Sequence, residues 1–379
     1  MGKFNLNFIR ICVINISGKI KIRQSKPKHS KRKLIKMKEF TKETINKYPY
    51  IKKNTLYFDI ETTGFINSNS HIYMIGMFYL NNNILRYKFL FAENLADEVQ
   101  ILTSFKNILS YFDNVITFNG TTFDIPYIKW RADYYGIDIS FQNISHTDMY
   151  RVFKSKSHLF NLKKYNQKSI EQFLGLFRED KYTGGDLIDI YKDYTNNPTS
   201  EKEYILTLHN INDLEGMAHV TNMHLYYATF DWELIKSNDS GDIYEITLKS
   251  KYSFPTNHIC SFDSCKVIYS SNNVIIQLPI ISDTKKLFFD DYQNYYFLPK
   301  EDMAIHKSVG QFVCAPNKIK ATKNTAYIKK TDRFIHLPFN LNNMFKDEYK
   351  DKTGYIPASQ FNNSIIDKLL QHNFGGKHK

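Results

Sequence analysis

The stretch Leu56–Gly64 reads Leu-Tyr-Phe-Asp-Ile-Glu-Thr-Thr-Gly and places two carboxylates, two residues apart, at the end of an apolar run. Apolar and aromatic residues up to Phe58 predict a strand, whose side chains alternate between its two faces. Asp59 and Glu61 then share one face, while Phe58 and Ile60 face the core. Two carboxylates this close repel each other unless a cation lies between them. A strand that simply ends in an acidic turn would show the same pattern. Other acidic positions in the chain must therefore decide between a turn and a metal site.

A second acidic position, Asp124, lies in the loop that follows a short predicted strand at 115–118. A helix is predicted at Pro126–Tyr135 directly after it. Ligands of open α/β sheets bind at such strand ends, so Asp124 and Asp59 can share a site if their strands are parallel neighbours. Alternatively, Asp124 is an N-cap before Pro126 in the first helical turn.

The third position is the pair His209 and Asp213 on a long predicted helix. This helix opens at Pro198-Thr199-Ser200, where Ser200 and Glu203 have the spacing of a capping box. His209 and Asp213 are four residues apart and so leave the same helical face. One of them can bind a metal while the other acts on a reacting water. A surface pair that only stabilises the helix has the same spacing.

The order of predicted elements around these positions indicates an α/β fold. Three strands precede a helix, and strands and helices then alternate. This order is typical of a ribonuclease H-like fold, a mixed sheet flanked by helices. The predicted strands lie at 55–60, 71–79, 84–91, 115–118 and near Thr147, and the predicted helices at 95–112, 126–135 and in shorter pieces up to about 196.

The three acidic motifs together resemble those of the DEDD 3′-to-5′ exonucleases of the ribonuclease H-like superfamily. Phe58–Gly64 resembles the first motif, Asn119–Tyr127 the second, and His209–Asp213 the third. The segment Arg178–Gly185, with Leu187 and Tyr191 after it, is similar to one carried by the bacterial YprB-like group. The resemblance covers about residues 54–229, and three ordered motifs make it specific.

This resemblance implies a two-metal phosphodiesterase that removes nucleotides from a 3′ end of DNA or RNA. By position, Asp59 would bridge two divalent cations, Mg²⁺ or Mn²⁺, with Glu61 and Asp213 completing one shell and Asp124 serving the other cation. The two ions, roughly 4 Å apart, would stabilise the attacking and leaving oxygens. His209 would be the general base that takes a proton from the attacking water.

One residue departs from the family pattern. In the family, a histidine base lies five residues before the final aspartate and a tyrosine lies four before it, whereas His209 lies four before Asp213. One helical position turns a side chain by about 100°, so the direction of this ring decides whether it can serve as the base. Thr62, Asn119 and Phe123, within the matching motifs, are the candidate substrate contacts.

The net charge of +13 is concentrated at the start of the chain. Residues 1–38 hold twelve Lys and Arg and no acid, and subtracting these from the 51 in the chain leaves 39 basic against 38 acidic residues. We expect residues 1–50 to be a basic, disordered leader, and Met37 to be an alternative start of translation. Such a leader could also add affinity for a phosphate backbone.

Residues 230–379 form a second predicted domain, which is β-rich or α+β. Strands are predicted at 243–248, 266–270, 274–281 and 287–289, and a short helix at 302–313. Aromatic residues at 292–297 and lysines at 300–330 could stack bases and hold phosphates, or could be core and solvated surface. No polymerase-type acidic motif occurs here, and about 150 residues are too few for a polymerase module.

Composition fits a cytoplasmic, reducing environment. Four cysteines (Cys12, Cys260, Cys265 and Cys314) in 379 residues predict free thiols, because their spacing matches neither a disulfide framework nor a zinc finger. No apolar run reaches membrane-spanning length. Two functions remain: a metal-dependent nuclease, or a non-catalytic nucleic-acid-binding module with the same fold. A module of the second kind is expected to lack one of the four acids, and all four are present.

Overall fold

The computed structural model describes residues 37–66, 69–178, 181–263 and 265–375. These residues form two compact units, one from residues up to Ser157 with Leu162–Met223, the other from His158–Asn161 with residues from His224 on. Residues 1–36 of the predicted leader, including Cys12, lie outside the described residues.

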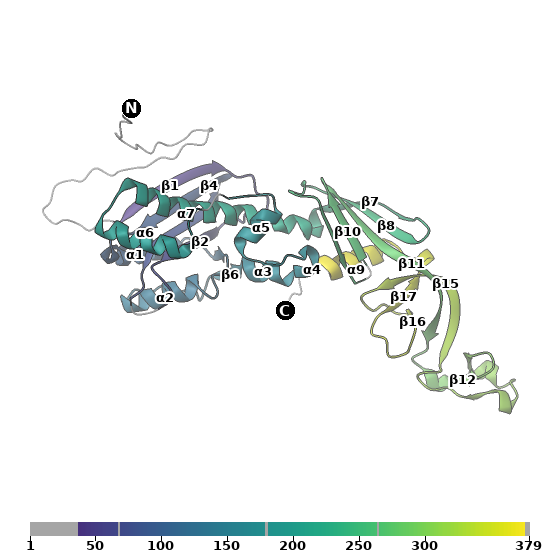
Figure 1. The fold of residues 1–379 in the computed structure, drawn as a ribbon. Coiled ribbons are helices and arrows are strands. Elements are labelled where there is room, and N and C mark those ends of the chain that lie inside the picture. The colour runs from purple at the N-terminus through teal and green to yellow at the C-terminus, as the bar shows by residue number, and fades with distance from the viewer. Residues whose placement is uncertain (1–36, 67–68, 179–180, 264, 376–379) are drawn as a thin grey trace. The chain divides into compact units, whose positions relative to one another are not determined.

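The first unit is built on a six-stranded mixed sheet, in the order β1-β4-β3-β2-β5-β6. Figure 1 labels β1, β2, β4 and β6 among its strands. The strands β1, β4, β3 and β2 pair antiparallel, whereas β2 pairs with β5, and β5 with β6, in parallel. The mixed sheet expected from the sequence is therefore confirmed. Its strands are β1 (Lys38–Ile45), β2 (Thr55–Thr62), β3 (Ile72–Asn81), β4 (Ile84–Phe91), β5 (Asn114–Thr117) and β6 (Ser145–Asp148).

The first strand corrects the predicted extent of the leader. Residues 38–45, which we expected to be disordered, pair along their whole length with β4, from Lys38 opposite Phe91 to Ile45 opposite Ile84. The strand is mostly polar, with Phe40 as its buried apolar residue. Composition alone missed it, because the charged residues typical of an edge strand are also those expected of a disordered segment.

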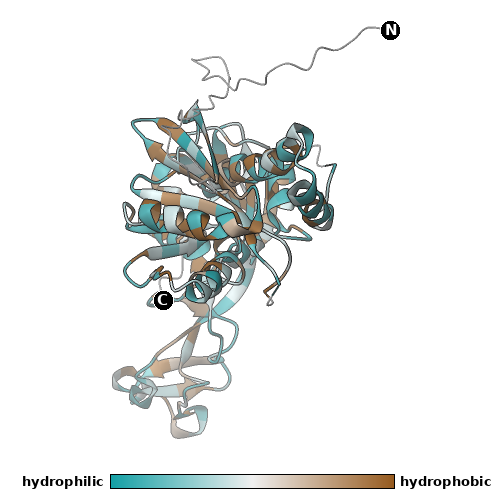
Figure 2. Cartoon of the chain, turned by 90° about the vertical axis from the view of Figure 1, so that its left-hand side faces the viewer, coloured by the Kyte–Doolittle hydropathy of each residue, from teal (hydrophilic) through white to brown (hydrophobic). Residues whose placement is uncertain are grey.

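Helices cover the sheet through amphipathic faces. Helix α1 packs on β3 and β4, and α7 packs on β2 and β3. The helices carry both hydrophobic and hydrophilic positions, as expected for helices with one buried face (Figure 2). The helices of this unit are η1 (Leu95–Asp97), α1 (Glu98–Leu109), α2 (Asp124–Tyr134), α3 (Met149–Ser155), α5 (Gln167–Phe173), α6 (Gly184–Asn196) and α7 (Ser200–Val220); α4 (Ser157–Phe160) and η2 (Thr221–Tyr226) contain residues of both units.

The start of α7 differs from the predicted capping box. Thr199 is the N-cap, and its side chain accepts a hydrogen bond from the backbone N–H of Lys202. Glu203 instead accepts a hydrogen bond from Lys38 of β1, at 2.6 Å. The carboxylate of Glu203 therefore pairs with a residue distant in sequence and does not form the helix cap that its local spacing had predicted.

The second unit is β-rich, as predicted, and centres on the long strand β11. This strand pairs with β8, β10, β15 and β16 within an eight-stranded sheet, and a separate three-stranded sheet has the order β13-β12-β14. The elements are η3 (Thr229–Asp231), β7 (Trp232–Asp239), β8 (Ile243–Ser250), β9 (His258–Phe262), β10 (Cys265–Ser270), β11 (Asn273–Phe288), η4 (Tyr292–Asn294), β12 (Tyr295–Leu298), β13 (Met303–His306), α8 (Lys307–Gly310), η5 (Ala315–Asn317), β14 (Ile319–Lys320), β15 (Tyr327–Leu337), β16 (Phe345–Lys346), β17 (Gly354–Pro357), η6 (Ala358–Gln360) and α9 (Asn363–Phe374).

Two predictions for this unit are wrong in detail. The strands predicted at 274–281 and 287–289 are one strand, because the polar residues between them pair with β15 and need no buried face. The helix predicted at 302–313 is mostly absent: Met303–His306 pairs with β12 as β13, and only Lys307–Gly310 is helical. In both places, strand pairing overrides the local pattern.

Lys329 and Lys330, two of the lysines of the second unit that we considered as phosphate contacts, are ion-paired. Lys285 lies opposite Lys330, and Lys286 opposite Lys329, in the β11–β15 ladder, and we call these four residues the lysine ribbon. Like charges directly opposite repel, so carboxylates beside them stabilise the pairing. The ion pairs are Lys285 with Asp283 and Asp347, Lys286 with Glu348, Lys329 with Asp302, and Lys330 with Asp332.

The cysteines that the structure describes are free thiols, as predicted. Cys260 and Cys265 are buried, and burial raises the pKa of each to about 12, which makes them unreactive at neutral pH. Cys314 is exposed. In the described part of the chain, no helix combines the length and apolar character needed to cross a membrane.

Candidate active site

Strand β2 presents Asp59 and Glu61 on one face, as alternation predicts. Phe58 points the other way and packs against Phe105 of α1, with ring centroids 5.2 Å apart. On the opposite face, the Nδ2 amide of Asn210 in α7 donates to Asp59 Oδ2 at 3.0 Å and reaches Glu61 Oε1 at 3.5 Å. Both carboxylates therefore lie under α7, where one buried amide contacts them.

Asp124 reaches the same region from the neighbouring strand. Because β5 pairs with β2 in parallel, the loop after β5 leaves the sheet beside the end of β2. Asp124 is the first residue of α2 rather than its N-cap, which is Phe123. Its Oδ1 accepts a hydrogen bond from the backbone N–H of Ile60 at 3.1 Å, and the side chain is only 3% exposed. The condition that the sequence set for a shared site, parallel neighbouring strands, is met.

The loop before Asp124 is held by Asp148 at the end of β6. Asp148 accepts hydrogen bonds from the backbone N–H groups of Asn119 and Thr121, at 2.9 and 3.1 Å. Asn119 adopts a left-handed backbone, with φ of 66°, and its side-chain oxygen accepts a hydrogen bond from Thr122 Oγ1. Asp148 therefore fixes the loop that delivers Asp124 to β2.

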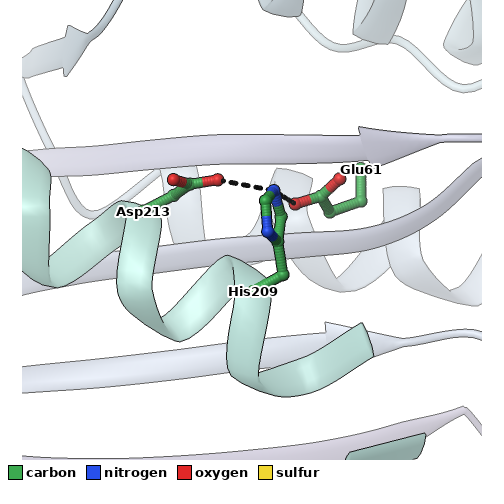
Figure 3. A group of neighbouring side chains, drawn as sticks. All are labelled: Glu61, His209 and Asp213. Carbon is green, nitrogen blue, oxygen red and sulfur yellow. Dashed lines mark ion pairs between the residues drawn. The ribbon is translucent and has the colours of Figure 1, made fainter. Parts of the chain in front are cut away.

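Helix α7 contributes His209 and Asp213, whose side chains leave the same face of the helix (Figure 3). His209 Nε2 lies 3.2 Å from Asp213 Oδ2 and 3.9 Å from Glu61 Oε1, so the ring stands between the two carboxylates. One ligand atom from each of these three residues lies within 4.8 Å of the others. This spacing would let them bind a common metal ion.

The close approach of α7 to the sheet depends on Gly76 in β3. Gly76 pairs directly with Asp59, and a Cβ atom at this position would lie 1.8 Å from Asn210 Oδ1 and 2.9 Å from Leu214 Cδ1. A side chain here would push the helix away. The glycine therefore lets Asn210 and its neighbours reach the carboxylates of β2.

Burial and mutual repulsion perturb the carboxylates. Burial, followed by the charges of Asp124, Asp213 and Glu61, raises the pKa of Asp59 well above its ordinary value. Burial and the charge of Asp213 raise the pKa of Glu61 to about 8. Burial raises the pKa of Asp124 to about 7, although hydrogen bonds from backbone N–H groups oppose the shift. Together these shifts indicate a site whose negative charge is only partly compensated by the protein.

Arg178 belongs to this site, a role that the sequence did not assign to it. Its Nη1 donates to Asp213 Oδ1 at 2.6 Å, and its charge acts on Asp59 by opposing the rise of its pKa. Asn210 was also missed, although it lies three positions before Asp213 on the same helical face. Neither spacing nor periodicity predicts this role, because Arg178 lies outside the helices and its partners lie on α5 and α7.

The three predicted substrate contacts differ in accessibility. Thr62 is 9% exposed, and its hydroxyl donates to the backbone carbonyl of Gly64. The half-buried Phe123 ring lies edge-on to the exposed Phe65, with centroids 6.4 Å apart. Thr62, Phe123 and Asn119, which lies in the loop before α2, remain predicted substrate contacts.

Comparisons with known proteins agree with this architecture. Residues 56–226 match the family model RNase_H_2, described as RNase_H superfamily. A search of curated proteins found no significant match.

The solved structures that match this chain do so at low sequence identity and with low TM-scores. A family B DNA polymerase from the archaeon Pyrobaculum calidifontis is 14% identical, with a TM-score of 0.34 over 65% of this chain and 36% of the polymerase. The Nibbler EXO domain of Aedes aegypti is 11% identical, with a TM-score of 0.30 over 46% of this chain and 81% of that domain. The zinc-bound E. coli ExoI–ssDNA complex is 12% identical, with a TM-score of 0.28 over 52% of this chain and 55% of ExoI. The match to the family model spans the positions of Asp59, Glu61, Asp124, His209 and Asp213.

Proposed function

We propose that this RNase H-superfamily chain is a metal-dependent 3′-to-5′ exonuclease that hydrolyses phosphodiester bonds of DNA or RNA. The observation that carries the proposal is the convergence of four acids on one place: Asp59 and Glu61 from β2, Asp124 from the start of α2, and Asp213 from α7. The superfamily match supports a nuclease-type function.

The donor set fits divalent cations. The four candidate ligands supply only carboxylate oxygens, which Mg²⁺ and Mn²⁺ prefer. Burial raises the pKa values of Asp59, Glu61 and Asp124, and the charges of neighbouring acids add to the shifts, so two bound cations would favour the ionised carboxylates. When bound, such cations stabilise negative charge that develops on the phosphate during hydrolysis.

The protein residues around the acids have separate tasks. Asn210 holds Asp59 and Glu61 at a fixed separation through its amide. His209, which lies between Glu61 and Asp213, would take a proton from an attacking water. Phe123 is the substrate contact with a partly exposed apolar ring, suited to packing against a nucleobase.

A non-catalytic nucleic-acid-binding module is the alternative from another class. Such a module has no use for buried carboxylates that repel a phosphate backbone as well as each other. The electrostatics of Asp59, Glu61 and Asp124 therefore favour the nuclease. Nucleic acid is the proposed partner in both cases.

The test uses 5′-end-labelled single-stranded and duplex DNA and RNA, incubated with Mg²⁺, Mn²⁺ or EDTA. We expect a ladder that shortens from the 3′ end in the presence of metal. Asp59→Asn keeps the side-chain volume and should reduce the rate by about 10³-fold or more, since metal ligation contributes several kcal/mol of transition-state stabilisation.

Asp133→Asn is the matched control, because Asp133 is exposed on α2 and takes no part in the acid cluster. Its rate should equal that of the wild type. Cleavage on none of the substrates, or equal rates for the two variants, would contradict the nuclease assignment.

A further inference from the structure

A buried ion pair supports Asp213 from outside the acid cluster. Arg178 uses two nitrogens on Glu171, with Nε donating to Oε2 at 2.6 Å and Nη2 to Oε1 at 2.7 Å. Its third nitrogen, Nη1, donates to Asp213 Oδ1 at 2.6 Å. The guanidinium thus joins Glu171 of α5 to Asp213 of α7 through a planar group whose nitrogens are fixed relative to one another.

Glu171 occupies a space built to receive it. Its side chain is 1% exposed, and Gln167 Nε2 donates both to Glu171 Oε1 at 2.9 Å and to the backbone carbonyl of Asp213 at 2.7 Å. Gly216, three residues after Asp213, makes the space: a Cβ atom there would lie 1.8 Å from Glu171 Oε1. Because α7 has no side chain at position 216, the carboxylate of Glu171 can occupy this space.

The ion pair with Arg178 also gives the two carboxylate oxygens of Asp213 different partners. Oδ1 accepts from Arg178, while Oδ2 faces His209 Nε2 at 3.2 Å, on the side where Glu61 lies. A carboxylate with one oxygen fixed in this way cannot rotate freely about its last bond. Only Oδ2 is left to face the acid cluster.

We propose that Arg178, anchored by Glu171, is a positioning residue that holds Asp213 with Oδ2 directed into the metal site. The inference rests on the proposed function in taking Asp213 as a metal ligand. It gives Arg178, which lies outside the three acidic motifs, a role in the metal site.

Charge and geometry make opposite predictions for Arg178, so they can be separated. If Arg178 acted only as a positive charge, removing it would strengthen cation binding by the cluster. If it positions Asp213, removing it weakens binding despite the loss of a repelling charge. Positioning groups of metal ligands affect metal affinity by about 10- to 100-fold.

The central experiment measures Mn²⁺ binding to the metal-free protein by calorimetry. Glu171→Gln/Arg178→Gln removes one charge of each sign, so the net charge is unchanged and Glu171 is not left as a buried, unpaired carboxylate. We expect Mn²⁺ affinity to fall about 10-fold. The Mn²⁺ concentration for half-maximal cleavage should rise by a similar factor, while turnover at saturating Mn²⁺ changes less.

Arg178→Lys is the second variant, because it keeps the charge but lacks the fork that bridges Glu171 and Asp213. This variant should also bind Mn²⁺ more weakly than the wild type. If the double variant loses its native circular dichroism, Mn²⁺ binding by Arg178→Lys decides whether Arg178 positions Asp213. Glu43→Gln/Arg86→Gln makes the same chemical change at an exposed pair between β1 and β4, and should bind as the wild type does.

Asp213→Asn separates failure of this inference from failure of the proposed function. Weaker Mn²⁺ binding by Asp213→Asn, with wild-type binding by the Arg178 variants, would overturn the positioning role alone. Unchanged binding by Asp213→Asn would overturn the metal-ligand assignment on which it rests.

Discussion

The acid cluster of the first unit and the lysine ribbon of the second both gather like charges, but they balance them differently. Each ribbon lysine has a carboxylate at ion-pair distance. Burial raises the pKa of Asp59, three further acids add to the shift, and the opposing charge of Arg178 does not cancel it. A charge that the fold neutralises is structural, whereas one that it leaves uncompensated indicates an external ligand. The comparison therefore distinguishes the acid cluster, a candidate ligand site, from the lysine ribbon, which composition alone would also suggest as a ligand site.

The largest expected effect concerns pH and the metal-free protein. The folded-state pKa values of Glu61, about 8, and Asp124, about 7, lie above their unfolded values, so the folded chain binds protons more tightly. Their contribution to stability is full below the unfolded pKa values and is lost as pH rises through the folded ones. Between about pH 5 and about pH 8, the free energy of unfolding should fall by a few kcal/mol, measured by urea denaturation.

Glu61→Gln is the control for this pH dependence, because the amide does not titrate. Its decline over the same range should be smaller, and excess Mg²⁺ should reduce the decline in the wild type by favouring the ionised acids. Equal declines in wild type and variant would mean that the cluster is compensated after all, and the contrast with the ribbon would be lost.

A second prediction concerns His209, which lies between two carboxylates. If His209 is the general base, His209→Ala should lower turnover by about 10²-fold, measured at saturating Mn²⁺, and leave Mn²⁺ binding largely intact. Loss of Mn²⁺ binding would instead make the imidazole a ligand, as its distances to Glu61 and Asp213 allow. Exposed His306, at the start of α8, is the matched site, and His306→Ala should change neither quantity.

The smallest expected effect is at the lysine ribbon. Lys286→Gln/Lys330→Gln should change the affinity for a labelled single strand in EDTA by less than about 2-fold, because these ammonium groups already face carboxylates. Fluorescence anisotropy at two salt concentrations gives the affinity and its salt dependence. A drop of tenfold or more would identify the ribbon as a nucleic-acid surface and remove the distinction drawn above.

Local pattern was enough to predict the parts of the site that a single strand or helix determines. Alternation placed Asp59 and Glu61 on one face, and helical spacing placed His209 beside Asp213. The mixed sheet followed from the order of strands and helices. Asp124 was placed beside β2 only on the condition of parallel pairing, which the sequence permitted but could not demonstrate.

The features that escaped prediction all depend on partners distant in sequence. Arg178 reaches Asp213 across 35 residues, and Asn210 reaches Asp59 across 151. The cavity that Gly216 makes for Glu171 is visible only when α5 lies against α7. Such contacts leave no periodic trace, because a buried polar group is selected by its partner and not by its neighbours in the chain.

Strand β1 also sets where this domain can be cut. Lys38 lies 2.6 Å from Glu203, and Lys42 pairs with Glu215, so the strand is tied to the helix that carries His209 and Asp213. A fragment beginning at residue 51 would expose all eight residues of β4 as an unpaired edge, open to pairing with another molecule. Any shortened form meant to keep the acid cluster should therefore retain the chain from residue 38 onward.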